Sequence, residues 1–508
     1  MDAAIFLISR LLFLNWGDVF FDSGEYISRW AEPNLLNALT SGHPPLHMGY
    51  VLWAWPIFRI LSGIGSNPLP IIMLVQTVMA LLTVVFFGNV FARLADSGVA
   101  KRAMILVSIL PIFWITNVSV MMETAYLFFF SGSLFFLTKY FGENKRVYLM
   151  ISCVFWLTAF LTHTVVIIWI PLVLYLFWIL GKKHILKLVI AGAATLAIAS
   201  VINAWFLSLS LGSSFGEGFY WLYAAKFGEH AWFSLSLETA ARYLRNWLLP
   251  LTYNFTSPVV IFGVISLVAL WKRNRKLFWL LFFWVSPSFI ANQWWDSLHY
   301  GRHALIAGFG LAFLTALVVK GRRFWLLAGF VLIISLSTMR WMNGPAPYQQ
   351  MAQNISRLPE GGLLIDSHFA RPQTQGKYDG TVLYVDEPGW SLEGAVVEIE
   401  EYLTHGRGVY ITGHALSEPY GLFSGPFLHP LSLSYRKPFN LQELAEKWGF
   451  EELTLVERDL NLVIYKILPE KNGYPDINKL SGSKRRIDYL DPSRLFWSAV
   501  SGGLNLGP

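Results

Sequence analysis

Acidic, histidine and arginine side chains gather at a few points of a chain that is otherwise strongly apolar. The first group stands in DVFFDSGEYISRW, residues 18–30, directly after the first apolar run. The whole set consists of Asp18, Asp22, Glu25, Glu32, His43, His47, Glu123, His163, Asp296, His299, Arg302 and His303. Carboxylates and imidazoles move protons in enzymes, and arginine with histidine neutralises phosphate. The set therefore indicates transfer chemistry on a phosphorylated substrate.

The composition indicates that membrane-spanning helices position these residues. Of 508 residues, 55% are hydrophobic and only 14% are charged, whereas soluble domains carry about 25% charged residues. A helix needs about 20 apolar residues to cross a bilayer. Apolar runs near that length lie at 69–92, 103–118, 121–140, 147–163, 164–180, 187–210, 254–271, 277–293, 303–320 and 323–340.

A shorter run, residues 3–16, is interrupted by Arg10. It is interpreted as a first span that is clipped or anchored by a snorkelling arginine. A signal peptide is the competing interpretation, but no small-residue cleavage site follows, and the charge stands in the middle of the run.

Lysine and arginine clusters between the runs predict the orientation. If the N-terminus is cytoplasmic and residues 17–68 form the first external loop, all dense basic clusters fall on the cytoplasmic side. The apolar stretch 44–64 is then a juxtamembrane helix rather than a span. The predicted fold is a mainly α-helical polytopic membrane protein of the cytoplasmic membrane, with about eleven transmembrane helices and an extracytoplasmic C-terminus.

The composition changes near Trp341. Short β-type runs such as GGLLIDSHF and NLVIYKIL are separated by Gly, Pro and Asp, and residues 391–406 and 441–450 are interpreted as helices. The predicted domains are a transmembrane domain at 1–342, an extracytoplasmic α/β domain at 343–469 and a flexible tail at 470–508.

Two other function classes are disfavoured. The formal net charge is +7, but the basic residues stand in small clusters between apolar runs, which is typical of cytoplasmic loops rather than of nucleic-acid binding. The single cysteine, Cys153, allows neither an internal disulfide nor a thiolate metal cage.

With this topology, every member of the polar set falls at the outer ends of the spans or in the external loops. Transfer of a sugar from a polyprenyl-phosphate carrier needs such a site, because the lipid tail lies among the spans and the phosphate lies at the interface. A carboxylate deprotonates the acceptor as it attacks the anomeric carbon. No cofactor is required, and a divalent cation is compatible with the pattern but not implied by it.

Four ordered motifs, FDSGEYISRW, GHPPLHMGYVLWAWPIFRI, METAYLFFFSGSLFFL and HYGRHALIAG, resemble the C-class membrane glycosyltransferases. The similar branch holds the protein O-mannosyltransferases and lipid A aminoarabinose transferases. In that family an acid followed four positions later by an aromatic residue opens the first external loop, and the acid is the proposed catalytic base. Asp22 with Tyr26 matches this pair. The motif from His43 to Leu46 matches the element that begins the family's juxtamembrane helix.

Roles are expected for the remaining residues as well, and one assignment stays open. Asp22 is expected to be the general base, with Glu25 as the alternative. His43, Arg302 and His303 are expected to contact the carrier phosphate. Glu123, His163 and His47 are expected to contact the donor sugar or to support the residues that contact it.

The sequence thus predicts an inverting glycosyltransferase whose partners are a polyprenyl-phosphate-linked sugar, the bilayer, and a lipid, glycan or protein acceptor. The alternatives are a lipid-linked glycan transporter or flippase, and a glycan polymerase or ligase. A transporter needs ionisable residues at the bilayer midplane. Such residues are scarce in these runs.

Overall fold

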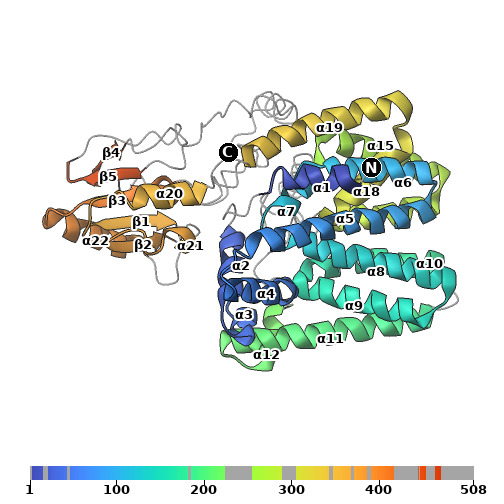
Figure 1. Ribbon diagram of the computed structural model, residues 1–508, viewed down its shortest axis with the longest axis horizontal. Helices are drawn as coiled ribbons and strands as arrows, with labels where there is room; N and C mark the ends of the chain where they lie inside the picture. Colours follow the sequence, from blue (N-terminus) through green and yellow to red (C-terminus); the bar gives the residue numbers. More distant parts are fainter. Residues whose placement is uncertain are drawn as a thin grey trace, which may run out of the picture. The chain divides into compact units, whose positions relative to one another are not determined.

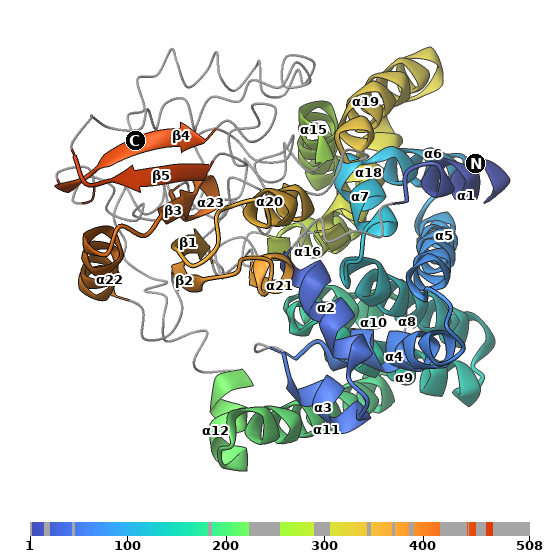
Figure 2. The ribbon, with the colours of Figure 1, turned by 60° about the vertical axis from the view of Figure 1, so that its left-hand side comes forward.

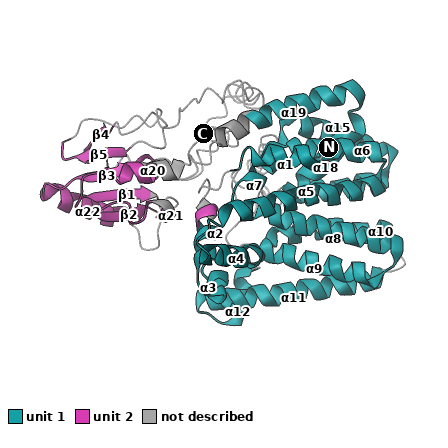
Figure 3. Cartoon of the chain, viewed as in Figure 1, with its two compact units in different colours: residues 1–16, 25–340 teal, residues 17–24, 341–508 magenta. Residues whose placement is uncertain are grey.

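The computed structural model describes residues 3–14, 21–42, 46–180, 185–222, 255–288, 305–342, 347–367, 371–385, 391–416, 444, 447–453 and 464–470. The chain divides into two compact units (Figure 3). The first unit holds residues 1–16 and 25–340, and the second holds residues 17–24 and 341–508. Each unit has hydrophobic clusters of its own.

The described part of the first unit is helical (Figure 1). Its elements follow, with the first residues of α2 and the last of α19 belonging to the second unit. They are α1 (Ala3–Leu11), α2 (Phe21–Ala31), α3 (Leu35–Thr40), α4 (Met48–Gly63), α5 (Leu69–Leu94), α6 (Ser97–Ile109), α7 (Pro111–Val118), α8 (Glu123–Glu143), α9 (Arg146–Thr162), the 3₁₀ turn η1 (Thr164–Trp169), α10 (Ile170–Leu180), α11 (Ile185–Leu211), α12 (Phe215–Tyr220), α15 (Ser257–Arg273), α16 (Arg275–Val285), α18 (Leu305–Val318) and α19 (Gly321–Met342).

Local sequence signals fix several helix starts. Asn34 and Asp96 accept backbone N–H groups in the first turns of α3 and α6, and Ser214 with Glu217 forms a reciprocal cap on α12. Proline stands at the first position of α7, where its missing N–H costs nothing. These polar stops divide the apolar runs into separate helices.

Two helices in the described residues are long and apolar enough to cross a membrane by themselves: α5, with 26 residues, and α11, with 27. α6 and α7 satisfy the same test only as a pair that is bent by 61°. The run 103–118 is therefore a broken helix rather than the continuous span expected from its composition. The count of about eleven spans and the orientation stay predictions.

Buried tryptophans link the helices of the main core. The Trp284 indole on α16 donates to the Ile306 carbonyl at 2.9 Å, and the Trp169 indole donates to the Trp284 carbonyl at 2.8 Å. An indole N–H needs an acceptor when it is buried. These bonds connect η1, α16 and α18 across long sequence separations.

The short helices α2, α3 and α4 gather at one end of the bundle formed by α5, α8, α9 and α11 (Figure 1, Figure 2). α4 lies so close to α9 that no side chain fits between them at Gly49. A Cβ added there would lie 2.7 Å from the Thr162 nitrogen and 2.9 Å from the Thr158 carbonyl oxygen. This approach fixes the start of α4 against the end of α9.

The structure corrects the interpretation of Arg10 as a snorkelling anchor. Arg10 is only 2% exposed, and its guanidinium donates to the Ser108 carbonyl. It also lies over the rings of Phe6 and Trp114, at 3.9 and 4.6 Å from the ring centroids. Arg10 therefore ties α1 to α6 and α7 inside the protein.

The second unit contains a five-stranded mixed sheet with the order β2-β1-β3-β5-β4. β1 pairs in parallel with β2 and with β3, whereas β5 pairs antiparallel with β3 and with β4. The elements are α20 (Pro347–Ile355), β1 (Leu363–Ser367), α21 (Arg371–Thr374), β2 (Thr381–Val385), α22 (Leu392–Thr404), β3 (Val409–Thr412), α23 (Gly413–Leu416), β4 (Gly449–Leu453) and β5 (Ile464–Leu468).

The helix predicted at 391–406 corresponds to α22, but the helix predicted at 441–450 is wrong at its end. Gly449 and Phe450 begin β4, which pairs with β5. Tertiary pairing overrides local helix preference there, because Phe450 and Ile467 bury their side chains in the sheet core. The proposed domain bounds stay predictions.

Replacing Gly49 with alanine is expected to lower stability by about 1–3 kcal/mol, because the added methyl meets backbone that cannot move aside. Gly63→Ala in the same helix is the matched control, since an added Cβ there meets nothing within 4 Å. The midpoint of thermal unfolding in detergent measures both. Equal midpoints for the two variants would contradict the close approach of α4 and α9.

Candidate active site

The predicted site residues fall into three groups. Glu25, His47, Glu123 and His163 are described with their side chains, whereas of Asp22 only the backbone position in the first turn of α2 is described. His43, Arg302 and His303, together with Asp296 and His299, lie outside the described residues. The described members lie on α2, α4, α8 and the α9–η1 junction.

Glu25 forms an ion pair with Arg29, one turn further along α2. The Arg29 Nη1 and Glu25 Oε1 atoms are 3.6 Å apart, and the side chains are 1% and 14% exposed. Burial lowers the pKa of the Arg29 guanidinium, and the charge of Glu25 opposes that shift. Glu25 therefore neutralises a buried cation.

The same guanidinium holds the following loop in place. Its Nε donates to the Ala38 carbonyl at 2.8 Å, and its Nη2 donates to the carbonyls of Leu39 and Leu46 at 3.2 and 2.7 Å. A Cβ at Gly42 would lie 2.7 Å from Glu25 Oε1, so the loop passes directly over the ion pair. This loop carries the segment that leads into the predicted phosphate ligand His43.

His47 and His163 lie together at the end of α9, with ring centroids 5.2 Å apart. His47 Nδ1 donates to the Thr162 carbonyl at 3.0 Å, whereas His163 Nδ1 accepts the Val165 N–H at 3.1 Å. In their neutral forms the two rings are therefore opposite tautomers, with the proton on Nδ1 of His47 and on Nε2 of His163. In these tautomers Nε2 of His47 is an acceptor and Nε2 of His163 is a donor.

Aromatic rings surround the histidine pair. Tyr26 lies edge-on to His47 at 6.0 Å, and Tyr126 lies edge-on to His163 at 5.5 Å. The Tyr26 hydroxyl donates to the Met122 sulfur at 3.1 Å. The aromatic residue of the Asp22–Tyr26 motif is therefore buried against His47.

Glu123 is fully buried in the first turn of α8, where the helix dipole favours a carboxylate. Burial, and secondly the charge of Glu123, raise the pKa of the Tyr50 phenol well above its usual value. Tyr50 thus stays neutral and donates to Gln76 Oε1 at 2.9 Å. Glu123 and Tyr50 belong to one buried polar region.

Arg29 and Gln76 each hold backbone segments of the site in place, and neither was identified from the sequence. The spacing of four from Glu25 was an available signal for Arg29. Gln76 donates to the Thr116 and Ser119 carbonyls at 2.8 and 2.7 Å, across about forty residues, so no local spacing marks it. An amide within a long apolar run was the only sequence signal for it.

The arrangement combines a buried carboxylate, two imidazoles and a loop that the Arg29 guanidinium fixes at one end of the helical unit. Such groups bind and orient a hydroxyl-rich, negatively charged ligand and exchange protons with it. Within the described residues, no group of three or more His, Cys, Asp and Glu side chains is arranged to hold a metal ion.

Arg29→Met is expected to destabilise the protein by about 3–5 kcal/mol, because it leaves the Glu25 charge and three carbonyls without their partner. Arg59→Met is the control, since Arg59 is exposed and donates to the Ala31 carbonyl at 3.1 Å. Its expected cost is at most about 1 kcal/mol. Chemical or thermal unfolding in detergent distinguishes them. A comparable loss of stability in both variants would contradict the role of Arg29 in holding the loop to α2.

No family model and no curated protein sequence matches this chain. Among solved structures it is similar to ArnT from Cupriavidus metallidurans bound to undecaprenyl phosphate, with 12% identity, a TM-score of 0.53, and 91% of this chain and 96% of that chain covered. It is also similar to the Archaeoglobus fulgidus oligosaccharyltransferase in complex with Zn and sulfate, with 13% identity, a TM-score of 0.50, and 92% and 72% coverage. Both are C-class glycosyltransferases. The chain is a membrane protein with the fold of the C-class glycosyltransferases, as its motifs predicted.

Proposed function

We propose that this protein is a membrane glycosyltransferase that moves a sugar from a polyprenyl-phosphate carrier to an acceptor on the extracytoplasmic face. The observation that carries the proposal is the buried group of Glu123, His47 and His163 at one end of a C-class helical unit. The undecaprenyl phosphate bound to ArnT supports a carrier of this chemical class. The acceptor is a lipid, a glycan or a protein.

Asp22 is the proposed general base, and the state of Glu25 supports this choice. A base must release its proton and take another during each turnover. Glu25 lies 3.6 Å from the buried Arg29 guanidinium, so its carboxylate is engaged in an ion pair within the protein. Asp22 lies one turn before Tyr26 on the same helix, α2. We therefore assign proton transfer to Asp22 and positioning of the loop to Glu25.

The remaining groups are assigned by their chemistry. His43, Arg302 and His303 neutralise the carrier phosphate, so that it leaves as a stabilised anion when the new glycosidic bond forms. The Nε2 atoms of His47 and His163, with Glu123, bind sugar hydroxyl groups. Direct displacement by the acceptor oxygen inverts the anomeric centre. A divalent cation is compatible with this scheme, and none is required by it.

Replacing Asp22 with asparagine is expected to lower kcat by about 10²–10⁴, the usual contribution of a general base. Glu25→Gln is the matched variant, expected to lower the unfolding midpoint while kcat falls less than tenfold. Release of polyprenyl phosphate from a panel of carrier-linked sugars measures turnover, and the anomeric configuration of the product is read by NMR.

Three outcomes would contradict the assignments. A well-folded, fully active Asp22→Asn variant excludes Asp22 as the base. A Glu25→Gln variant that keeps its stability but loses the larger share of kcat makes Glu25 the base instead. A product that retains the anomeric configuration excludes direct displacement.

A further inference from the structure

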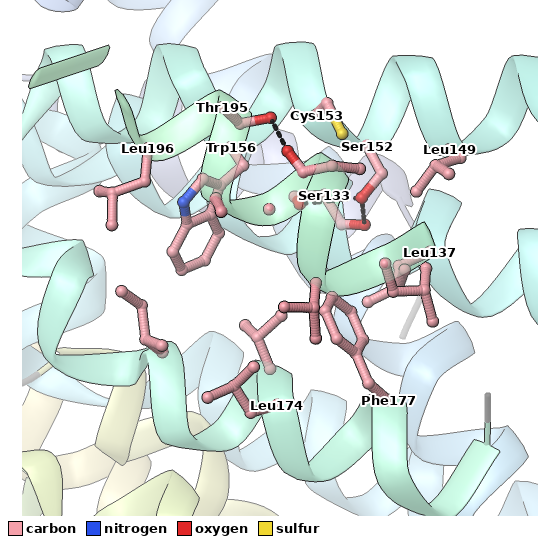
Figure 4. A pocket seen from close by; sticks show the side chains of 17 residues that line it. Ser133, Leu137, Leu149, Ser152, Cys153, Trp156, Leu174, Phe177, Thr195 and Leu196 are labelled. Carbon is pink, nitrogen blue, oxygen red and sulfur yellow. Dashed lines mark hydrogen bonds between the residues drawn. The ribbon is translucent and has the colours of Figure 1, made fainter. Parts of the chain in front are cut away.

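A cavity of about 240 Å³ lies between α8, α9, α10 and α11, separate from the candidate active site (Figure 4). On α8 it begins at Ser133, ten residues beyond Glu123, and on α9 it extends from Trp156 back to Leu149. Ten helical residues span about 15 Å. The cavity therefore lies deep along the bundle, toward the turn between α8 and α9.

The walls offer an occupant almost only apolar contact. The hydroxyls of Ser133 and Ser152 bond to each other at 3.1 Å, and the Thr195 hydroxyl donates to the Ala191 carbonyl at 2.8 Å (Figure 4). These hydroxyl groups are satisfied by the protein, and apart from the Cys153 thiol the other walls are aliphatic and aromatic. A cavity of this kind excludes water and accepts hydrocarbon.

The cavity reaches the outer apolar surface of the helical unit. Leu174 on α10 and Val189 on α11 line it, and they are 47% and 43% exposed. Their exposed neighbours on the same helices, Trp178 and Ile190, are apolar too. A chain entering between α10 and α11 thus passes from lipid into the cavity without crossing a polar layer.

Basic residues stand at the end of the bundle that the cavity approaches. Lys187 precedes the lining residue Leu188, and Arg146 lies one turn before the lining residue Leu149. The acid at this end, Glu143, pairs with Lys145 at 2.8 Å. The local charge is therefore positive, which favours an anionic headgroup.

We propose that the cavity between α8, α9, α10 and α11 binds an acyl chain of an anionic phospholipid, whose headgroup lies beside Lys187 and Arg146. Apolar walls and the lateral opening specify a hydrocarbon chain. The basic cluster specifies the negative headgroup. The site is independent of the glycosyltransferase reaction proposed above.

Gly192 on α11 allows the cavity to be filled without disturbing the helices. It lines the cavity, and a Cβ added there meets nothing within 4 Å. Gly192→Leu is therefore expected to occupy the space that the acyl chain needs. Gly329→Leu on α19 is the matched control, because an added Cβ there also meets nothing within 4 Å and Gly329 does not line the cavity.

Cys153 lines the cavity and is the only cysteine of the chain, so its alkylation reports occupancy. The full chain is placed in vesicles of dioleoyl phosphatidylglycerol or of dioleoyl phosphatidylcholine, and its reaction with N-ethylmaleimide is timed. Alkylation is expected to be at least tenfold slower in phosphatidylglycerol. Lys187→Gln is expected to weaken that preference by about fivefold, the share of one basic residue near an anionic headgroup.

Native mass spectrometry after detergent extraction supplies the second measurement. The wild type and Gly329→Leu are expected to retain phosphatidylglycerol, and Gly192→Leu is expected to lose it. Equal retention by Gly192→Leu, or equal protection of Cys153 by both lipids, overturns the proposal. Protection of Cys153 by polyprenyl phosphate but not by phosphatidylglycerol would mean that the cavity binds the sugar carrier, and this outcome also overturns the proposal. If Gly192→Leu does not fold, the wild-type rates in the two lipids decide.

Discussion

One buried cation, Arg29, determines the shape of the first loop. Removing an ion from water costs several kcal/mol, and a hydrogen bond to a charged group returns about 1.5–3 kcal/mol. The guanidinium donates to the backbone carbonyls of residues 38, 39 and 46 and has a carboxylate at 3.6 Å, and these contacts together offset its desolvation. The carbonyls of residues 38, 39 and 46 must therefore converge on α2. The Arg29 charge therefore fixes this loop at the end of the apolar bundle, because the loop carbonyls and Glu25 compensate for its burial.

A second polar contact supports this end of the bundle from within. Gln76 lies on α5, one of the two long apolar helices, where an amide needs a partner because no water is present. It accepts from Tyr50 on α4 and donates to the carbonyls at the end of α7 and just beyond it. Thr124 adds a bond to the Thr116 carbonyl at 2.7 Å. The turn that carries Glu123 is thus held from both sides, and the site is positioned by the same bonds that satisfy buried backbone.

The sequence predicts the helices of this protein better than the tertiary contacts between them. The apolar runs at 69–92 and 187–210 coincide with α5 and α11, because uninterrupted hydrophobicity is a local property. The break between α6 and α7 follows from Pro111, a visible signal, and the angle of 61° does not. Arg10 and Gln76 find acceptors about forty to a hundred residues away, and β4 exists because β5 pairs with it. Such pairings depend on the assembled fold, which local spacing does not encode.

The backbone of His47 has a consequence for natural variation at this position. Its φ of 45° and ψ of 38° place it in the left-handed region, immediately before α4. Such a conformation costs about 1–2 kcal/mol for most L-residues and little for glycine, with asparagine and aspartate intermediate. Residue 47 is therefore under two separate constraints: the left-handed backbone conformation, and the contacts made by the imidazole ring. Homologues that need only the turn should carry Gly, Asn or Asp at this point, whereas an unbroken record of histidine would mean that selection preserves the ring itself.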